Sequence, residues 1–355
     1  MLNKDFYRVK AQNLRKALFL ILKSYGVNTD RANLVSKYLV EADLSGQNSH
    51  GTARIPFYLK KVLNKDINIF SKTKIKKETA TTAQVDGDWG FGQIAADKAI
   101  KICIKKAIKS NIACVTLKNA NHMGRLADFT GQAAKKDLVG IGFANLHGTS
   151  HIVSPYGGID RKLPTNPICI STPGHNKKNL FELDMSTSSV AEGKLKIDYI
   201  LKRKTRRGYI IDNFGRDTQD TKKFYENPKG SLLPLGGISA FKGFGLAMGI
   251  DILSGALSEA GCSSSKYKKH GNSVTFIVIK ISAFTKISKF KKNVYDLIKH
   301  VKKSKLQKGF KKILVPGEFE TNNKIINIKK GVKIDKVTYK ELKKIISHKD
   351  IKVKI

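Results

Sequence analysis

The chain has 355 residues, of which 41% are hydrophobic, so it is long enough to bury a large core. No stretch approaches the roughly 20 apolar residues that a membrane-spanning helix needs. The first thirty residues also lack the apolar core and cleavage site of a signal peptide. These features argue against a membrane protein and predict a cytoplasmic one.

The formal net charge of +39 has two interpretations. A basic chain can bind nucleic acid or an acidic membrane, or it can simply carry a lysine-rich surface. The lysines are scattered along the chain, and its densest basic stretches, 202–207 and 302–308, contain no aromatic residues for base stacking. We therefore predict no specific nucleic-acid partner and no membrane partner.

The four cysteines are widely spaced and form no Cys-x-x-Cys pair. No histidine lies near them at the spacing of metal ligands. This pattern predicts reduced, buried thiols and no metal site.

The N-terminal part is predicted to be helical. Leu14, Leu18 and Leu22 follow the spacing of a helix, and Asn28 precedes a second apolar-periodic segment as a capping residue would. A third helix is predicted over 55–63. The run Ser49-His50-Gly51 falls between the last two helices, so we expect it at a helix end.

Residues 76–87 read as a strand that ends at the turn Asp86-Gly87. The following run, Gly90-Phe-Gly92-Gln, precedes a predicted helix. It lacks the third glycine of a dinucleotide-binding loop, and no acidic residue follows a second strand about 20 positions on. We favour a tight turn before a helix over a phosphate-binding loop.

The rest of the chain alternates short apolar runs with helical segments. Strands are predicted at 112–117, 139–144, 168–170, 180–183 and 274–281, and helices near 125–136 and over 241–260. This alternation predicts an α/β sheet domain.

Two histidines stand out as candidates for proton transfer. His50 follows a serine and precedes Arg54 by four residues; histidine exchanges a proton near neutral pH, and arginine has a planar fork that fits a carboxylate. His122 follows a predicted strand, where ligands of α/β proteins bind, although a lone histidine is more often structural. The hydroxyls after Asp184 either hold a phosphate or cap a helix. These residues alone indicate an α/β enzyme with an anionic ligand.

Seven short motifs occur in an order that resembles the malate/L-lactate dehydrogenase family, over about residues 6–345. They are Ser49-His-Gly-x-x-Arg54-x-Pro-x-Tyr58, Asn121-His-x-Gly124, Pro155-Tyr-Gly-Gly158, Thr165-Asn-Pro167, Asp184-Met-Ser-Thr-Ser188 with Gly193-Lys194, Pro234-Leu-Gly-Gly237 with Lys242-Gly-Phe-Gly-Leu246, and Val315-Pro-Gly-Glu318. This is a non-Rossmann group that also includes ureidoglycolate, sulfolactate and diketogulonate enzymes.

The resemblance implies a mixed-sheet α/β fold like that of L-sulfolactate dehydrogenase. It implies a helical region over 1–75 that packs with a C-terminal tail over 316–355, and a nicotinamide- and substrate-binding region over 76–315. It also implies an NAD- or NADP-dependent oxidoreductase, a homodimer, that interconverts a small anionic 2-oxo acid and a 2-hydroxy acid.

The same resemblance implies roles for single residues. His50 would be the proton donor as a charged imidazole, with Ser49 and Asp184 as relay partners and His122 as the competing donor. Arg54 would bind the substrate carboxylate, with Tyr58, Thr165 and Asn166 nearby. The implied cofactor contacts are Leu183, Asp184, Met185, Ser186, Thr187, Ser188, Ser189, Phe241, Lys242, Gly317, Glu318 and Phe319. The alternative is a catalytically inactive relative that binds anions or nucleic acid through its charge.

Overall fold

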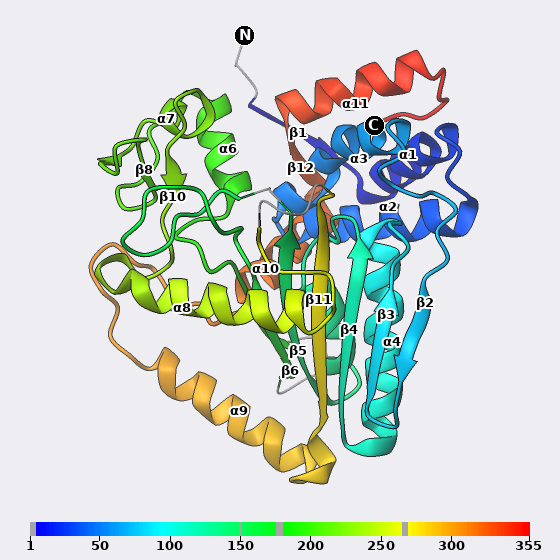
Figure 1. The fold of residues 1–355 in the computed structure, drawn as a ribbon, viewed down its shortest axis with the longest axis vertical. Coiled ribbons are helices and arrows are strands. Elements are labelled where there is room, and N and C mark those ends of the chain that lie inside the picture. The colour runs from blue at the N-terminus through cyan, green and yellow to red at the C-terminus, as the bar shows by residue number, and fades with distance from the viewer. Residues whose placement is uncertain (1–4, 149–150, 175–179, 265–268) are drawn as a thin grey trace.

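The computed structural model describes residues 5–148, 151–174, 180–264 and 269–355. Its centre is a seven-stranded mixed sheet in the order β2-β3-β4-β11-β5-β6-β7 (Figure 1). Only β3 and β4 pair in parallel; the other neighbours are antiparallel. The strands are β2 (Lys74–Glu78), β3 (Thr82–Asp86), β4 (Ile112–Ala120), β5 (Leu138–His147), β6 (Ile168–Pro173), β7 (Leu180–Met185) and β11 (Gly271–Lys280).

The segment predicted as one strand over 76–87 is therefore two strands, β2 and β3. They are joined by a tight turn in which the amide of Thr79 donates to the carbonyl of Thr82 at 3.0 Å. The sequence prediction missed this turn because it contains neither glycine nor proline, the usual signals of a turn.

Two helices cover one face of the sheet, α4 (Gly92–Ser110) and α5 (Ala127–Ala134). Side chains alternate between the faces of a strand, so Val274, Phe276 and Val278 of β11 all point toward these helices and belong to the main core. Phe129 of α5 packs on Phe276 in that core. Burial of this apolar surface is what holds the helices on the sheet.

The opposite face carries α8 (Ala240–Asp251), which continues as a π-helix over Ile252–Ala256. The hydroxyl of Thr275, on the other side of β11, donates to the Leu253 carbonyl at 2.6 Å. The helix predicted over 241–260 thus changes its winding at 252 and ends at 256. By length and composition Gly237–Ala256 would suffice to cross a membrane, contrary to our expectation, and 33% of the most apolar 18 residues in it are buried in the protein.

A helical layer formed by α1 (Ala11–Ser24), α2 (Thr29–Leu44) and α3 (Ile55–Leu63) has its own core. As predicted, Asn28 caps α2, because its side chain accepts from the Arg31 amide at 3.0 Å. Distant parts of the chain complete this layer: β1 (Phe6–Val9) pairs with β12 (Val332–Asp335), and α11 (Lys336–His348) shares the core. The division of the chain at residues 75 and 315 stays a prediction.

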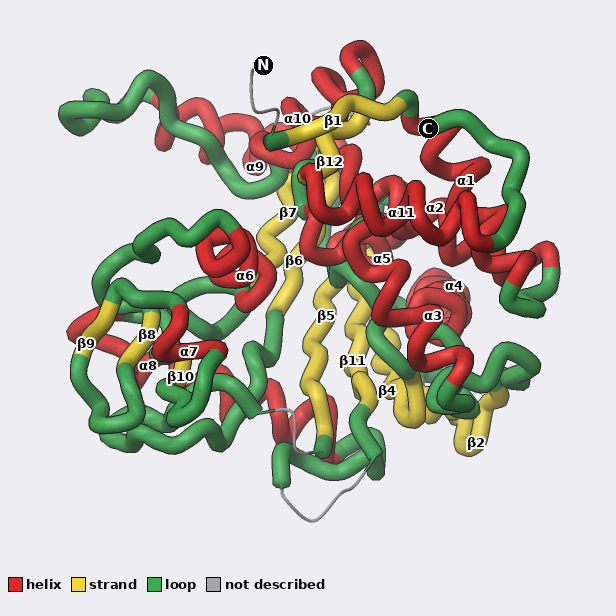
Figure 2. The backbone as a smooth tube through the Cα atoms, turned by 90° about the horizontal axis from the view of Figure 1, so that it is seen from above, coloured by secondary structure: helices red, strands yellow, loops and turns green. Residues whose placement is uncertain are grey.

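A small lobe lies beside the β7 edge of the sheet (Figure 2). It contains α6 (Glu192–Ile200), α7 (Lys222–Tyr225) and a three-stranded sheet of β8 (Ile210–Ile211), β9 (Asp217–Thr218) and β10 (Ser231–Leu232). Leu195, Phe224 and Leu232 form its core. Two further helices, α9 (Ile287–Lys302) and α10 (Glu318–Lys330), follow β11, and α9 has no buried residue.

Candidate active site

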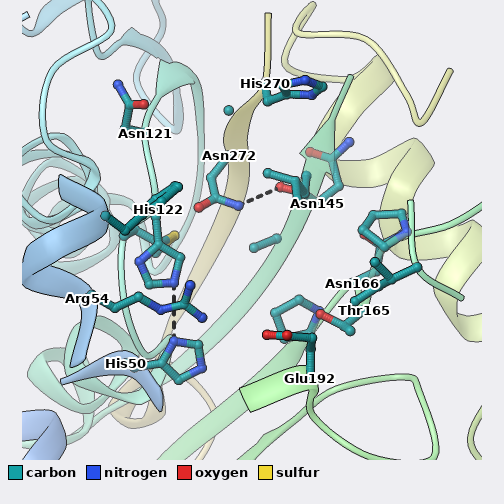
Figure 3. A pocket seen from close by; sticks show the side chains of 18 of the residues that line it. His50, Arg54, Asn121, His122, Asn145, Thr165, Asn166, Glu192, His270 and Asn272 are labelled. Carbon is teal, nitrogen blue, oxygen red and sulfur yellow. Dashed lines mark hydrogen bonds between the residues drawn. The ribbon is translucent and has the colours of Figure 1, made fainter. Parts of the chain in front are cut away.

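The candidate site is a cavity of about 490 Å³ between the helical layer, the sheet and the small lobe (Figure 3). His50 and Arg54 come from the helical layer, His122 follows β4, and Glu192 begins α6 of the lobe. A second cavity of about 390 Å³ shares His50 and Arg54 with the first and extends along residues 184–194. The two cavities therefore adjoin at the predicted donor and anion-binding residues.

The loop that carries His50 is hydrogen-bonded to a buried acidic side chain, that of Asp43. The loop consists of two short 3-10 turns, Asn48–His50 and Thr52–Arg54, between α2 and α3. Asp43 of α2 accepts hydrogen bonds from the backbone amide of Thr52, at 2.8 Å, and from its hydroxyl. A Cβ at Gly51 would lie 2.0 Å from Asp43 Oδ1, so only glycine allows this close approach. The pair Asp43 and Gly51 thus fixes the position of His50.

The structure brings the two candidate histidines into contact. His50 Nδ1 lies 3.2 Å from His122 Nε2, and the ring planes differ by 12°. The other ring nitrogen of His122, Nδ1, lies 2.7 Å from the hydroxyl of Tyr58, which accepts a hydrogen bond from Gln93 Nε2 at 2.7 Å. The second nitrogen of His50 is turned toward the cavity (Figure 3).

The surroundings of both histidines favour the neutral ring. Burial lowers the pKa of His50 to about 3, and the positive charges of Arg54 and Arg125 add to this shift. Burial also lowers the pKa of His122 well below its ordinary value, with contributions from Arg54, His50 and Lys61. A charged imidazole here would be favoured by a negative charge brought close to the ring, such as that of a bound anion.

Asp184 and Ser49 make other contacts than the implied relay. Asp184 Oδ2 accepts from the backbone amide of Ala127 at 3.0 Å; burial raises the pKa of Asp184, and the positive charge of Arg125 opposes this shift. The Ser49 carbonyl accepts from Arg54 Nε at 2.6 Å, which orients the guanidinium. Both residues line the second cavity together with His50. Their role as relay partners of His50 stays a prediction.

Two buried amide oxygens in the wall of the main cavity have no hydrogen-bond partner among the described residues. They belong to Asn166 and Asn272. The Asn166 backbone is held in an uncommon conformation with φ of 22°, and its Nδ2 donates to the Ala247 carbonyl at 2.9 Å. An unpaired buried acceptor is costly, so both oxygens are ready to accept from N–H or O–H groups of a ligand.

Some of the predicted cofactor residues line the second cavity, and others do not. Asp184, Met185, Ser186, Ser188 and Ser189 line the second cavity, next to Thr165. Thr187 is buried and donates to the carbonyls of Thr165 and Asn166. The α6 N-cap is Ala191, without a side-chain cap, so these hydroxyls do not cap the helix. Among the described residues that line the two cavities, none comes from 241–242 or 317–319.

Residues 241–242 and 317–319 lie at the N-terminal ends of two helices, α8 and α10. Phe241 of α8 is half-exposed and touches the ring of Tyr156. Gly317 precedes α10 and packs against the backbone of β7, with Glu318 bonded to Lys302. Glu320, in the first turn of α10, lines the second cavity.

Sequence reasoning missed several residues of the cavity wall. Asn145 lies near the end of β5 and Asn272 near the start of β11; Glu192 lies inside the 183–194 segment but was given no role, and His270 lies outside the motifs. A polar side chain at the end of an otherwise apolar strand was the available signal for the two asparagines. For Glu192 the signal was its place in the 183–194 segment, whereas His270 had none, because its place depends on how the elements around the cavity pack.

Comparisons with known proteins agree with this architecture. A sequence model of the malate/L-lactate dehydrogenase family matches residues 9–343. L-sulfolactate dehydrogenase of Methanocaldococcus jannaschii is 36% identical, with 95% of this chain and 96% of that protein covered. Malate dehydrogenase of Pyrococcus abyssi is 33% identical, with 99% and 97% covered. The structure of malate dehydrogenase from Entamoeba histolytica superposes with a TM-score of 0.92 at 26% identity, covering 99% and 100% of the two chains.

The chain belongs to the malate/L-lactate dehydrogenase family. The predicted mixed α/β fold is confirmed, since the structure of sulfolactate dehydrogenase from M. jannaschii superposes with a TM-score of 0.84 over 97% of this chain. The site residues inferred from the family motifs stay predictions.

The buried Asp43 makes the stability of the protein depend on pH. Burial raises its pKa from 3.8 to about 7. The folded state therefore holds the Asp43 proton more tightly than the unfolded state does. The stability that this proton contributes is fully present below about pH 4 and is lost as pH rises through about 7. The free energy of unfolding falls in this range by at most about 1.4 kcal/mol per pH unit. The variant Asp43→Asn would keep an acceptor for Thr52 without titrating. As pH rises from 4 to 8, the free energy of unfolding of Asp43→Asn should increase relative to that of the wild type. Urea denaturation at each pH measures this difference. Parallel pH profiles would contradict this account.

Proposed function

We propose that this protein is an NAD- or NADP-dependent dehydrogenase that interconverts a small 2-oxo acid and the corresponding 2-hydroxy acid. The observation that carries the proposal is the shared cavity of His50 and Arg54, in a chain of this family. A carboxylate bound by the Arg54 fork would place the neighbouring oxygen within the reach of an imidazole proton. Relatives named for sulfolactate, malate and hydroxycarboxylates support this substrate class.

The cavity residues fit a nicotinamide dinucleotide. The unpaired oxygens of Asn166 and Asn272 suit amide or hydroxyl donors, and the hydroxyls of Ser186 and Ser189 line the adjoining cavity. Phe241, Lys242 and the segment 317–319 remain proposed contacts on the basis of the family motifs. When bound, the cofactor supplies the hydride for the carbonyl carbon, or accepts it in the reverse reaction.

The residues of the chain then manage orientation and proton transfer. Arg54, held by the Ser49 carbonyl, would bind the substrate carboxylate and orient its 2-oxo group. Burial excludes water and strengthens each charge interaction within the cavity. His50 would deliver the proton to the oxygen on which negative charge develops, and this step is worth about 10²–10⁴-fold in rate. His122, in contact with His50, is the competing donor.

Arg54 connects substrate binding to the protonation of His50. Burial is the largest cause of the low pKa of His50, about 3, and the positive charge of Arg54 is the second largest. A bound carboxylate offsets that charge and adds a negative charge of its own, so the pKa of His50 should rise on binding. The charged imidazole would thus form in the complex, where its proton is used.

We further infer that the protein is a soluble, cytoplasmic homodimer. The outer face of the segment from Gly237 to Leu257 exposes large apolar side chains, among them Ile238 at 98% and Ile252 at 54% exposure. Exposed large apolar side chains gathered along one segment favour an interface, and identical copies commonly associate in this way. Self-association would bury these apolar side chains, so their exposure is explained without a membrane partner.

Turnover tests the proposed function directly. We expect purified protein to oxidise reduced nicotinamide with at least one member of a panel of 2-oxo acids that includes oxaloacetate, pyruvate and sulfopyruvate. His50→Ala should lower kcat at least about 10²-fold with little change in cofactor affinity. His122→Ala should have the smaller effect. Complete inactivity with both nicotinamides and no cofactor binding would refute the proposal, and a larger effect of His122→Ala would exchange the two roles.

Proton uptake tests the coupling between Arg54 and His50. We expect binding of a 2-oxo acid, in the presence of oxidised nicotinamide so that no reaction occurs, to take up a fraction of a proton at neutral pH. Titration calorimetry in buffers of different ionisation enthalpy measures it as a buffer-dependent binding heat. His50→Ala serves as the control, because the buffer dependence should disappear. A wild-type binding heat that is the same in all buffers would contradict the coupling.

The proposed dimer is tested through its apolar face. Ile252→Asp should shift the sedimentation coefficient from that of a dimer to that of a monomer, because a buried carboxylate in an apolar interface is unfavourable. Leu63→Asp is a matched control, since Leu63 is 68% exposed at the end of α3. Dimers that persist in Ile252→Asp, or wild-type protein that sediments as a monomer, would exclude this interface.

A further inference from the structure

A buried chain of hydrogen bonds runs from the first turn of α4 to the cavity. It starts at Gln93, which is fully buried, and passes through Tyr58 and His122 to His50. Gln93 belongs to the Gly90-Phe-Gly92-Gln run, and none of these four residues lines either of the two cavities described above. This leaves the run without an assigned function.

Gly92 explains how α4 reaches the histidines. A Cβ at this position would lie 2.0 Å from the Asn121 carbonyl oxygen and 2.7 Å from that of His122. The first turn of α4 therefore rests directly on the backbone that carries His122. This contact places the Gln93 amide beside the Tyr58 hydroxyl.

The donors and acceptors give this chain a direction. The Gln93 amide nitrogen can only donate, so the Tyr58 oxygen accepts at 2.7 Å. The Tyr58 hydrogen then has two possible acceptors, His122 Nδ1 at 2.7 Å and the His122 carbonyl at 3.4 Å. The shorter contact is the better hydrogen bond. His122 Nδ1 is therefore an acceptor.

The direction continues to the cavity. A neutral His122 that accepts at Nδ1 carries its proton on Nε2, and it donates this proton to His50 Nδ1 at 3.2 Å. A neutral His50 that accepts at Nδ1 carries its own proton on Nε2, the nitrogen turned toward the cavity (Figure 3). In the opposite arrangement, neutral His50 would have no proton on Nε2, and a ligand would meet this nitrogen as an acceptor until the ring takes up a second proton.

We propose that Gln93 is a positioning residue that, through Tyr58, sets the tautomers of His122 and His50 so that His50 presents an Nε2 proton to the cavity. The effect on catalysis rests on the proposed function, whereas the tautomers are a property of the free protein. Gln93 touches neither substrate nor reacting atoms in this scheme. Two hydrogen-bonded neutral histidines can hold their protons in two arrangements of similar energy. The hydrogen bond from Gln93 to Tyr58 favours one of them.

Nitrogen-15 NMR of histidine side chains measures these tautomers without any turnover. In wild-type protein we expect both His50 and His122 to carry their protons on Nε2. A proton on Nδ1 of either ring would overturn the proposal, whatever the enzyme activity. If the predicted tautomers are found and no 2-oxo acid is reduced, the proposed function fails while this assignment stands.

The variant Gln93→Met removes the donor and keeps the length of the side chain. We expect the Nε2-protonated fraction of His50 to fall and kcat to drop about tenfold, with KM for the 2-oxo acid changed less than about twofold. Gln132→Met is the matched control: Gln132 also donates to a tyrosine hydroxyl, that of Tyr38, at 3.0 Å, but outside the cavity. It should leave the tautomers and kcat unchanged. Unchanged His50 and His122 signals in a folded Gln93→Met protein would overturn the proposal.

Discussion

The 3.2 Å contact between His50 and His122 is the interaction on which the site depends. One histidine belongs to the helical layer and the other follows a strand of the central sheet, so the contact exists only when these two layers are packed correctly. Each ring determines where the other can hold its proton. Small contacts far from the ligand, such as Asp43 under the His50 loop and α4 against the His122 backbone, therefore act on the same pair of rings.

Burial and charge give this pair its second property. The cavity removes both rings from water, and Arg54 and Arg125 surround His50 with positive charge. These effects disfavour the protonated ring until an anion is present. One arginine would thus do two things, since it binds a carboxylate and sets the protonation of its neighbour. The strong positive charge of the whole chain adds to the attraction of anions but is not needed for this local effect.

Much of the fold could be predicted from the sequence, because apolar spacing reports which side of a helix or strand is buried. The predicted third helix, 55–63, agrees with α3, and most central strands were predicted near their observed bounds. The errors have local causes: a turn without glycine or proline separates β2 from β3, and α8 changes to a π-helix at Ile252. The helix α9 was missed, although Ile287, Phe290, Val294 and Ile298 follow helical spacing.

By itself, the sequence determined the family, through motifs whose residues lie close together along the chain, and it singled out His50, His122 and Arg54 as chemistry-bearing side chains. Only the tertiary structure decided that the two histidines touch, that Tyr58 and Gln93 stand behind them, and that Asn145, Asn272 and Glu192 complete the cavity. The physical reason is that periodicity and motif spacing report local burial and local geometry. Contacts across layers, and the pKa shifts that follow from them, depend on how sheet, helices and lobe pack together.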